Sequence, residues 1–157
     1  MNSQPSKTRI LMVCLGNICR SPLAHGILES KLPSRTYFID SAGTSNYHID
    51  AQPDKRSIAV AKENGLDITS QKARQFTILD FEDFDIIYAM DKSNYQNILD
   101  LAQSETDRLK VKLILNENPS IKDKNVPDPY YGGDSGFEYV FRILNETCEI
   151  IAKRLLK

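Results

Sequence analysis

The stretch from residue 10 to residue 28 constrains the fold of this chain more than any other. Residues 10–13 form a short apolar run, residues 14–20 form a polar turn that contains a glycine, and the apolar positions from Ser21 onwards take up helical spacing. This pattern predicts a strand, a loop and a helix in direct succession. Cys14 and Arg20 stand at the two ends of the predicted loop, with five residues between them.

The predicted loop is suited to hold a tetrahedral oxyanion. A loop of this length, curled at a helix N-terminus, can turn successive backbone N–H groups inward around an anion. Arg20 then offers a planar fork of donors for two of the anion's oxygens, a pairing that lysine cannot reproduce. Gly16 and Asn17 tolerate the positive φ that such a curl requires. The expected anion-binding residues are Leu15, Gly16, Asn17, Ile18 and Cys19.

Cys14 is the candidate nucleophile. The helix dipole, the loop amides and the Arg20 guanidinium all favour its thiolate form, and a thiolate that faces a bound phosphate faces an electrophile. Ser21 is expected to cap the helix, with Pro22 at the first helical position, and its hydroxyl is placed to donate toward the Cys14 sulfur. The alternative interpretation is that Cys14 merely ends a buried strand and Arg20 is a solvated loop residue. The combined pattern of strand, Gly-Asn pair and Ser-Pro start favours the functional interpretation.

Length and charge narrow the classes of function. A chain of 157 residues is expected to form one domain over residues 1–157, burying about two thirds of its unfolded surface. The 20 Lys and Arg residues balance 21 Asp and Glu residues to a net charge of −1, which argues against a nucleic-acid or membrane partner. Residues 1–7 look flexible and polar, and no apolar segment resembles a signal peptide, so a cytoplasmic location is expected.

The cysteine count supports the same location. Three cysteines make no disulfide framework, and their spacing fits no zinc site, so we expect neither a metal nor another cofactor. Reduced thiols suit a reducing compartment. Cys148 falls at an apolar position of the last helix and is interpreted as a buried core residue, while His25, on the side of the first helix, is assigned no role.

Strands alternate with helices along the rest of the chain. Strands are predicted at residues 8–14, 37–42, 85–90 and 110–115, and helices at residues 21–32, 53–64, 92–102 and around 137–155. The alternation predicts a three-layer α/β/α fold, flavodoxin- or Rossmann-like, with a four-stranded parallel sheet. Ligands bind at the carboxyl ends of the strands in such sheets. Cys14 and the long loop at residues 116–135, predicted to lack regular structure, are therefore expected on the same rim.

The run VCLGNICRSP at residues 13–22 resembles the signature of the low-molecular-weight protein tyrosine phosphatases, in the human-like branch. Three later stretches strengthen the resemblance: DSAGTS at 40–45, KARQ at 72–75 and DPYYGGDSGFE at 128–138. The resemblance covers essentially the whole chain. It implies a phosphotyrosine phosphatase that acts through a phosphocysteine on Cys14, takes phosphotyrosine proteins as substrates, and is a monomer with at most weak self-association.

The resemblance also completes the proposed site. Expulsion of a phenolate requires a proton donor, because a phenol with a pKa of about 10 leaves more easily as the neutral alcohol. By composition alone Asp128 is a turn residue between prolines, but the family's DPYY aspartate is the general acid, which assigns that role to Asp128. Tyr130 and Tyr131, and opposite them Tyr47, are by the same resemblance walls of a slot that selects phosphotyrosine by reach. The alternative role for Tyr130 and Tyr131 is packing within the loop. The resemblance also implies that these two tyrosines are themselves phosphorylated.

Two further expectations concern the loop's surroundings. Cys19 either fills space as a small apolar residue or, as the family suggests, forms a disulfide with an oxidised Cys14 and so protects it. Gln71 departs from the family, in which a histidine at this position helps to brace Asn17 and Ser21. Bracing is therefore expected to be weaker or rerouted, although Ser41 and Asp91 match other supporting positions.

Three other functions remain as alternatives. A thioredoxin-coupled arsenate reductase needs two more relay cysteines, and the sequence has none between Cys19 and Cys148. A phosphoarginine phosphatase has threonine at the position of Ile18. A non-catalytic phosphopeptide-binding module needs neither Cys14 nor Asp128.

Overall fold

The computed structural model describes residues 6–131 and 133–157, without the side chains of residues 131 and 134. Most of the predicted flexible lead-in, residues 1–5, lies outside this part of the chain. Among the described residues, no helix combines the length and the apolar character that crossing a membrane requires.

The described strands form one parallel sheet in the order β2-β1-β3-β4. They are β1 (Thr8–Cys14), β2 (Tyr37–Gly43), β3 (Ile86–Ala89) and β4 (Val111–Leu113). β1 occupies a central position, where Cys14 pairs with Gly43 of β2 and Val13 with Ala89 of β3. The order reverses direction between β1 and β3, which is where ligands bind in doubly wound sheets.

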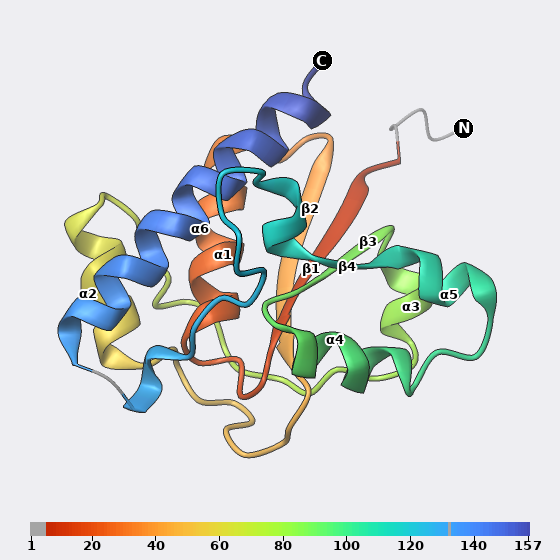
Figure 1. The fold of residues 1–157 in the computed structure, drawn as a ribbon, viewed down its shortest axis with the longest axis horizontal. Coiled ribbons are helices and arrows are strands. Elements are labelled where there is room, and N and C mark those ends of the chain that lie inside the picture. Colours follow the sequence, from red (N-terminus) through yellow and green to blue (C-terminus); the bar gives the residue numbers. More distant parts are fainter. Residues whose placement is uncertain (1–5, 132) are drawn as a thin grey trace.

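Helices cover both faces of this sheet, as Figure 1 shows. On one face lie α1 (Arg20–Lys31), α2 (Lys55–Glu63) and α6 (Asp134–Leu155), and on the other lie α3 (Asp80–Asp83), α4 (Lys92–Leu99) and α5 (Glu105–Lys110). The pleat of β1 divides its side chains accordingly, because Ile10 and Met12 join the first core while Leu11 and Val13 join the second. The predicted three-layer fold with a four-stranded parallel sheet is confirmed.

Several predicted bounds are wrong by one to three residues. The second helix begins at Lys55 and not at residue 53, because the Asp54 side chain accepts the Arg56 N–H and caps it. The fourth strand is only three residues long, since Lys110 ends α5 and a 3₁₀ turn, η1 (Ile114–Glu117), follows the strand. The short helices α3 and α5 were not predicted, because four to six residues carry no readable helical period.

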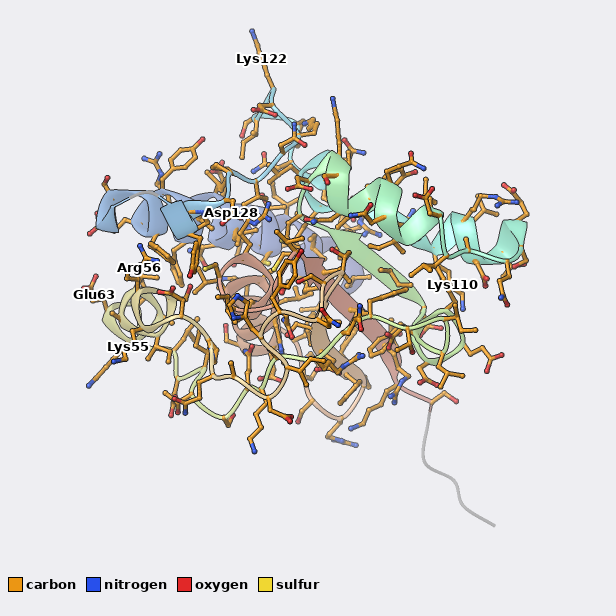
Figure 2. All side chains as sticks on the ribbon, turned by 90° about the horizontal axis from the view of Figure 1, so that it is seen from below. Lys55, Arg56, Glu63, Lys110, Lys122 and Asp128 are labelled. Carbon is orange, nitrogen blue, oxygen red and sulfur yellow. The ribbon has the colours of Figure 1, made fainter. Side chains whose placement is uncertain are left out.

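The segment between β4 and α6 returns to the carboxyl edge of the sheet. The Val126 N–H donates to the Met90 carbonyl just after β3, at 2.8 Å, which brings the following Asp128 to this edge (Figure 2). The prediction that residues 116–135 lack regular structure is wrong in part. This stretch contains the end of η1, a second 3₁₀ turn, η2 (Pro129–Tyr131), and the first residues of α6.

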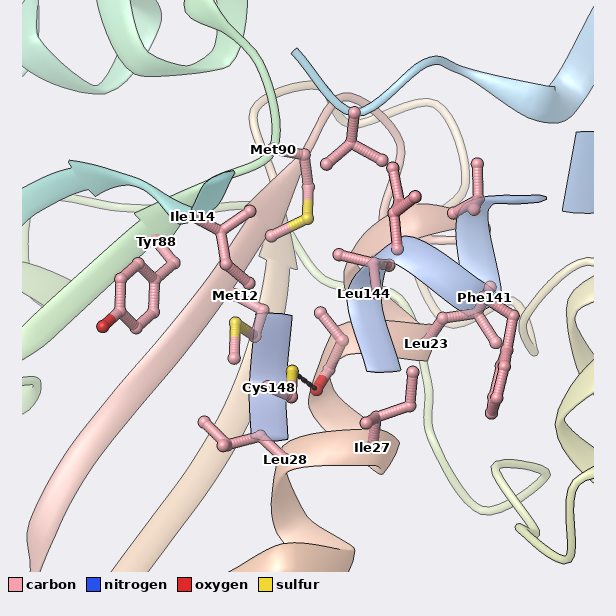
Figure 3. Packing of buried hydrophobic residues seen from close by; sticks show 14 of the residues in the cluster. Met12, Leu23, Ile27, Leu28, Tyr88, Met90, Ile114, Phe141, Leu144 and Cys148 are labelled. Atoms are coloured by element: carbon pink, nitrogen blue, oxygen red, sulfur yellow. Dashed lines mark hydrogen bonds between the residues drawn. The ribbon is translucent and has the colours of Figure 1, made fainter. Parts of the chain in front are cut away.

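The core between α1, α6 and the sheet fixes the start of α1 and hence the loop before it (Figure 3). Leu23, Ile27 and Leu144 are fully buried there. Cys148 lies among them, its sulfur 3.9 Å from the Ala24 carbonyl oxygen, and burial raises its pKa to about 12. The interpretation of Cys148 as a buried core residue is confirmed.

Candidate active site

The loop after β1 uses its carbonyl oxygens and leaves its amides unused. The Leu15 carbonyl accepts the Ser45 N–H at 2.9 Å, and the Ile18 carbonyl accepts the Asp54 N–H at 2.8 Å. In contrast, no backbone N–H from residue 15 to residue 19 donates to another described protein group. The loop borders a cavity of about 300 Å³. Donors held beside a cavity without protein partners are what an oxyanion site requires.

Asn17 gives the loop its curl. Its φ is 59°, in the left-handed region that asparagine tolerates better than most residues. Its side chain is bonded at both ends, since Oδ1 accepts the Arg74 N–H at 3.1 Å and Nδ2 donates to Ser21 Oγ at 2.7 Å. Gly16, which also tolerates a positive φ, does not adopt one. Its lack of a side chain serves another purpose, because a Cβ there would lie 3.0 Å from the His48 ring.

The end of β2 presses directly on the loop. A Cβ on Gly43 would lie 2.7 Å from the Leu15 carbonyl oxygen and 3.0 Å from the Asn17 nitrogen, both backbone atoms. The 2.7 Å distance is shorter than real Cβ contacts, and both neighbours are backbone atoms that cannot turn aside, so glycine allows this approach. Gly43, in the DSAGTS motif, therefore lets the backbone at the end of β2 lie directly against the backbone of the loop.

Cys14 is the last residue of β1 and is almost fully buried at the base of the loop. Its sulfur lies 3.0 Å from Ser21 Oγ. Because Asn17 donates to that oxygen, the Ser21 hydroxyl hydrogen is available for the Cys14 sulfur. The prediction that Ser21 caps α1 is wrong: the helix begins at Arg20, and the hydroxyl is engaged with the loop. Pro22 is the third helical residue, still in the first turn, where a missing N–H costs nothing.

Arg20 is buried beside Cys14, and its side chain is held by groups from the segments that follow β3 and β4. Its Nη1 donates to Asp91 Oδ2 at 2.6 Å and to the Val126 carbonyl at 3.0 Å, and its Nη2 lies 3.7 Å from Asp128 Oδ2. Burial alone disfavours the charged form, but the neighbouring groups, Cys14 first among them, outweigh it and raise the Arg20 pKa. The guanidinium is therefore a permanent, oriented cation.

Asp128 lines the same cavity as Cys14 and Arg20. Its Oδ1 accepts the Tyr130 N–H at 3.0 Å, while Oδ2 points toward Arg20. The side chain is 34% exposed, far more open than Cys14 or Arg20. The fold thus brings together the cysteine, the arginine and the aspartate that the sequence singled out.

Aromatic side chains border the mouth of the cavity. Tyr47 and Tyr130 both line it, with exposed fractions of 75% and 40%. The Tyr131 side chain lies outside the described residues. His48, which the sequence analysis missed, also lines the cavity, with its ring centroid 6.5 Å from that of Tyr130. A single histidine in a polar loop carries no signal that distinguishes it from a surface residue.

Gln71, the departure from the family, bonds to α1, while the loop is braced from the neighbouring Arg74. Gln71 Nε2 donates to the Pro22 carbonyl at 3.1 Å, on α1, and the Arg74 backbone N–H donates to Asn17 Oδ1. The Arg74 side chain, in the KARQ motif, is anchored in turn by ion pairs to Asp40 at 3.2 Å and to Asp80 at 3.0 Å. This support arises from three separate segments and was not predicted.

His25 and Cys19 are two further buried residues close to the loop. Ser41 Oγ lies 3.1 Å from Nδ1 of His25, whose Nε2 lies 3.5 Å from Glu29, so His25 packs α1 against β2. Cys19 also lines the cavity, and burial, followed by the charge of Asp54, raises its pKa far above the ordinary value. Cys14 and Cys19 are both free thiols.

Comparison with known proteins matches this geometry to one family. The model of the low molecular weight phosphotyrosine protein phosphatase family matches residues 9–157. A putative low-molecular-weight protein-tyrosine-phosphatase of Synechocystis is 43% identical over 144 residues, covering 89% of this chain and 91% of that protein. The human low molecular weight phosphotyrosine protein phosphatase is 37% identical over 159 residues, covering 98% of this chain and 99% of that protein.

Solved structures agree with the sequence comparison. A protein tyrosine phosphatase from Entamoeba histolytica, crystallised with Hepes in the active site, superposes with a TM-score of 0.90 at 38% identity, covering 95% of this chain and 97% of that one. The family model spans the strand, the anion loop and the aspartate segment alike. The chain therefore belongs to the low molecular weight phosphotyrosine protein phosphatase family.

Proposed function

We propose that this protein hydrolyses phosphotyrosine in proteins through a phosphocysteine intermediate. One observation carries the proposal. The sulfur of Cys14, 3.0 Å from the Ser21 hydroxyl, sits below a loop whose amides have no other partners among the described residues, with Arg20 and Asp128 lining the same cavity. A nucleophile, an anion cradle and a proton donor are the three parts that phosphate-ester cleavage needs.

In the first step the Cys14 thiolate attacks phosphorus in line with the ester oxygen. An S–P bond forms as the P–O bond to the tyrosine breaks, and the Asp128 carboxyl gives its proton to the departing oxygen. Arg20 and the loop N–H groups hold the three equatorial oxygens, where charge spreads in the transition state. Ser21, by donating to the sulfur, stabilises the thiolate both as nucleophile and later as leaving group.

In the second step water releases the phosphate. Asp128, now a carboxylate, takes a proton from water, the water oxygen bonds to phosphorus, and the S–P bond breaks. The products are inorganic phosphate and the Cys14 thiolate, ready for the next substrate. The chain's own residues supply every acid, base and donor in this scheme, so the proposal includes no metal or other cofactor. It also takes the active form to be a monomer in the cytoplasm, where the thiols stay reduced.

The aromatic mouth supports phosphotyrosine as the substrate. Phosphorus must reach Cys14 at the bottom of the cavity, and Tyr47, His48 and Tyr130 line its approach. A phenyl ring spans such a depth and stacks on aromatic walls, whereas the short arm of phosphoserine does not.

The test is hydrolysis of para-nitrophenyl phosphate by the wild type, Cys14→Ser and Asp128→Ala, followed by a comparison of phosphotyrosine, phosphoserine and phosphoarginine. We expect preference for phosphotyrosine, no turnover by Cys14→Ser and a loss of roughly a hundredfold or more in Asp128→Ala. Turnover by Cys14→Ser would disprove the nucleophile, and preference for phosphoarginine would replace the substrate class. A wild type that binds phosphotyrosine without turnover would be a binding module.

A further inference from the structure

The first turn of α2 touches both halves of the site. On one side, the Asp54 N–H donates to the Ile18 carbonyl at 2.8 Å and Ser57 Oγ donates to the Cys19 carbonyl at 3.3 Å. These bonds hold the second half of the anion loop against the start of α2. The position of this turn is therefore fixed relative to the anion loop.

On its other side, this turn binds the segment that carries Asp128. Arg56 Nη2 donates to the Tyr130 carbonyl at 3.0 Å. Its guanidinium carbon also lies 5.7 Å from the Tyr130 ring centroid and 4.5 Å from that of Phe137, at the start of α6. Since the Tyr130 N–H donates to Asp128 Oδ1, both polar groups of the Tyr130 backbone are used, one for the acid and one for Arg56.

The Arg56 guanidinium is itself locked in place. Asp54 Oδ1 accepts from the backbone N–H and from Nε of Arg56, at 2.8 and 3.0 Å, and Asp54 Oδ2 accepts from Nη2 at 3.1 Å. This fork leaves the planar group one orientation, with Nη2 shared between Asp54 and the Tyr130 carbonyl. A chain of contacts thus runs from the anion loop through Asp54 and Arg56 to the acid's own turn.

We propose that Arg56 is a positioning residue for the proton transfer, acting through Tyr130 to hold Asp128 over the leaving oxygen. This inference rests on the function proposed above. Arg56 is not among the described residues that line the cavity, so the proposed role runs through its bond to Tyr130. A general acid works only within hydrogen-bond reach of the oxygen it protonates, and a displacement of about 1 Å costs roughly a hundredfold in rate.

The test is the dependence of kcat/KM on the leaving group. A dinitrophenyl phosphate releases a stable anion that needs little protonation, whereas phenyl phosphate depends on the acid. Arg56→Gln is expected to lose about tenfold on phenyl phosphate and less than about twofold on dinitrophenyl phosphate. Arg56→Lys, which retains a donor without the fork, should recover part of the loss on phenyl phosphate.

Lys55→Gln is the matched control. Lys55 precedes Arg56, is exposed and extends away from the protein in Figure 2. The Lys55→Gln variant should retain wild-type kcat/KM on both esters.

In the double variant with Asp128→Asn, Arg56→Gln should add no further loss, because Arg56 acts only through the acid. Thermal unfolding of each variant separates a positioning effect from loss of the folded state, and Arg56→Lys carries the same test if Arg56→Gln does not fold.

The outcomes separate the two proposals. If Asp128→Asn itself loses equally on both esters, the proposed acid is wrong. If Asp128→Asn shows the expected dependence but Arg56→Gln and Arg56→Lys lose equally on both esters, or lose nothing, the positioning role of Arg56 is disproved. Additive losses in the double variant would also disprove it.

Discussion

The two halves of the site are held in different ways. The anion loop is embedded: Asn17, Arg20 and Ser21 are at most 3% exposed, and most of the loop's carbonyls are bonded to neighbouring segments. The Asp128 segment lies at the surface, with an acid side chain 34% exposed. The half that must cradle charge is preorganised and rigid, since reorganisation during the reaction would cost rate. The half that must let substrate enter and product leave carries its acid near the solvent.

The largest effect should come from oxidation within the embedded half. We expect peroxide to oxidise Cys14 to a sulfenic acid. The Cys19 sulfur then attacks the Cys14 sulfur, and the S–O bond breaks as the Cys19 proton goes to the departing hydroxide, which leaves as water; the disulfide abolishes activity until reductant is added. Cys19→Ser should lose activity irreversibly instead. Cys148, which lies fully buried in the core and does not line the cavity, should resist iodoacetamide, because the reagent does not reach it. Peptide mass spectrometry that finds no crosslink between residues 14 and 19 would refute this pairing.

Next in size should be Gly43→Ala. Its Cβ would meet the Leu15 carbonyl oxygen at 2.7 Å, so the loop must shift, with an expected loss of about a hundredfold in kcat and about 1–3 kcal/mol in the free energy of unfolding. Gly133→Ala, in the surface half, is the matched control, because no described atom lies within 4 Å of its Cβ and its φ is −84°. If Gly43→Ala and Gly133→Ala changed kcat and the thermal unfolding temperature equally, the difference between the two halves would be contradicted.

A smaller effect is expected for Asn17→Ala. This change removes the donor to Ser21 and the acceptor of the Arg74 N–H, and places alanine at a φ of 59°. We expect about a tenfold to hundredfold loss in kcat and about 1–2 kcal/mol in stability, both measurable by steady-state kinetics and denaturant unfolding. Asn17→Asp keeps the acceptor but sets a negative charge beside the anion, and should raise KM more than Asn17→Ala does.

The smallest effect is expected at the mouth. Tyr47 is 75% exposed, so Tyr47→Ala should leave the folded state and para-nitrophenyl phosphate turnover almost unchanged. KM for a phosphotyrosine peptide should rise by about threefold to tenfold, since stacking contacts are worth about 0.5–1.5 kcal/mol. Peptide kinetics equal to those of the wild type would remove Tyr47 from the substrate-binding wall.

Prediction from the sequence succeeded where the interacting residues are neighbours along the chain. The strand, the loop and the helix from residue 10 to residue 28 share one continuous stretch, so their spacing reveals their geometry. Prediction failed where the partner is distant or is a backbone atom. Nothing in the sequence marks the Val126 carbonyl as a partner of Arg20, or the Arg74 N–H as a partner of Asn17. Asp128 was found only through its resemblance to a family motif, because by composition it reads as a turn.

The sequence by itself determined the alternating strands and helices, the place of the anion loop at the end of the first strand, and the burial of Cys148, since all three follow from local periodicity and hydrophobic pattern. Only the tertiary structure decided that Ser21 serves the Cys14 sulfur and not the helix cap, that Gly43 makes room for the loop, and that Arg56 joins the two halves. Those contacts link segments far apart in the chain, where packing and hydrogen-bond geometry override local preference.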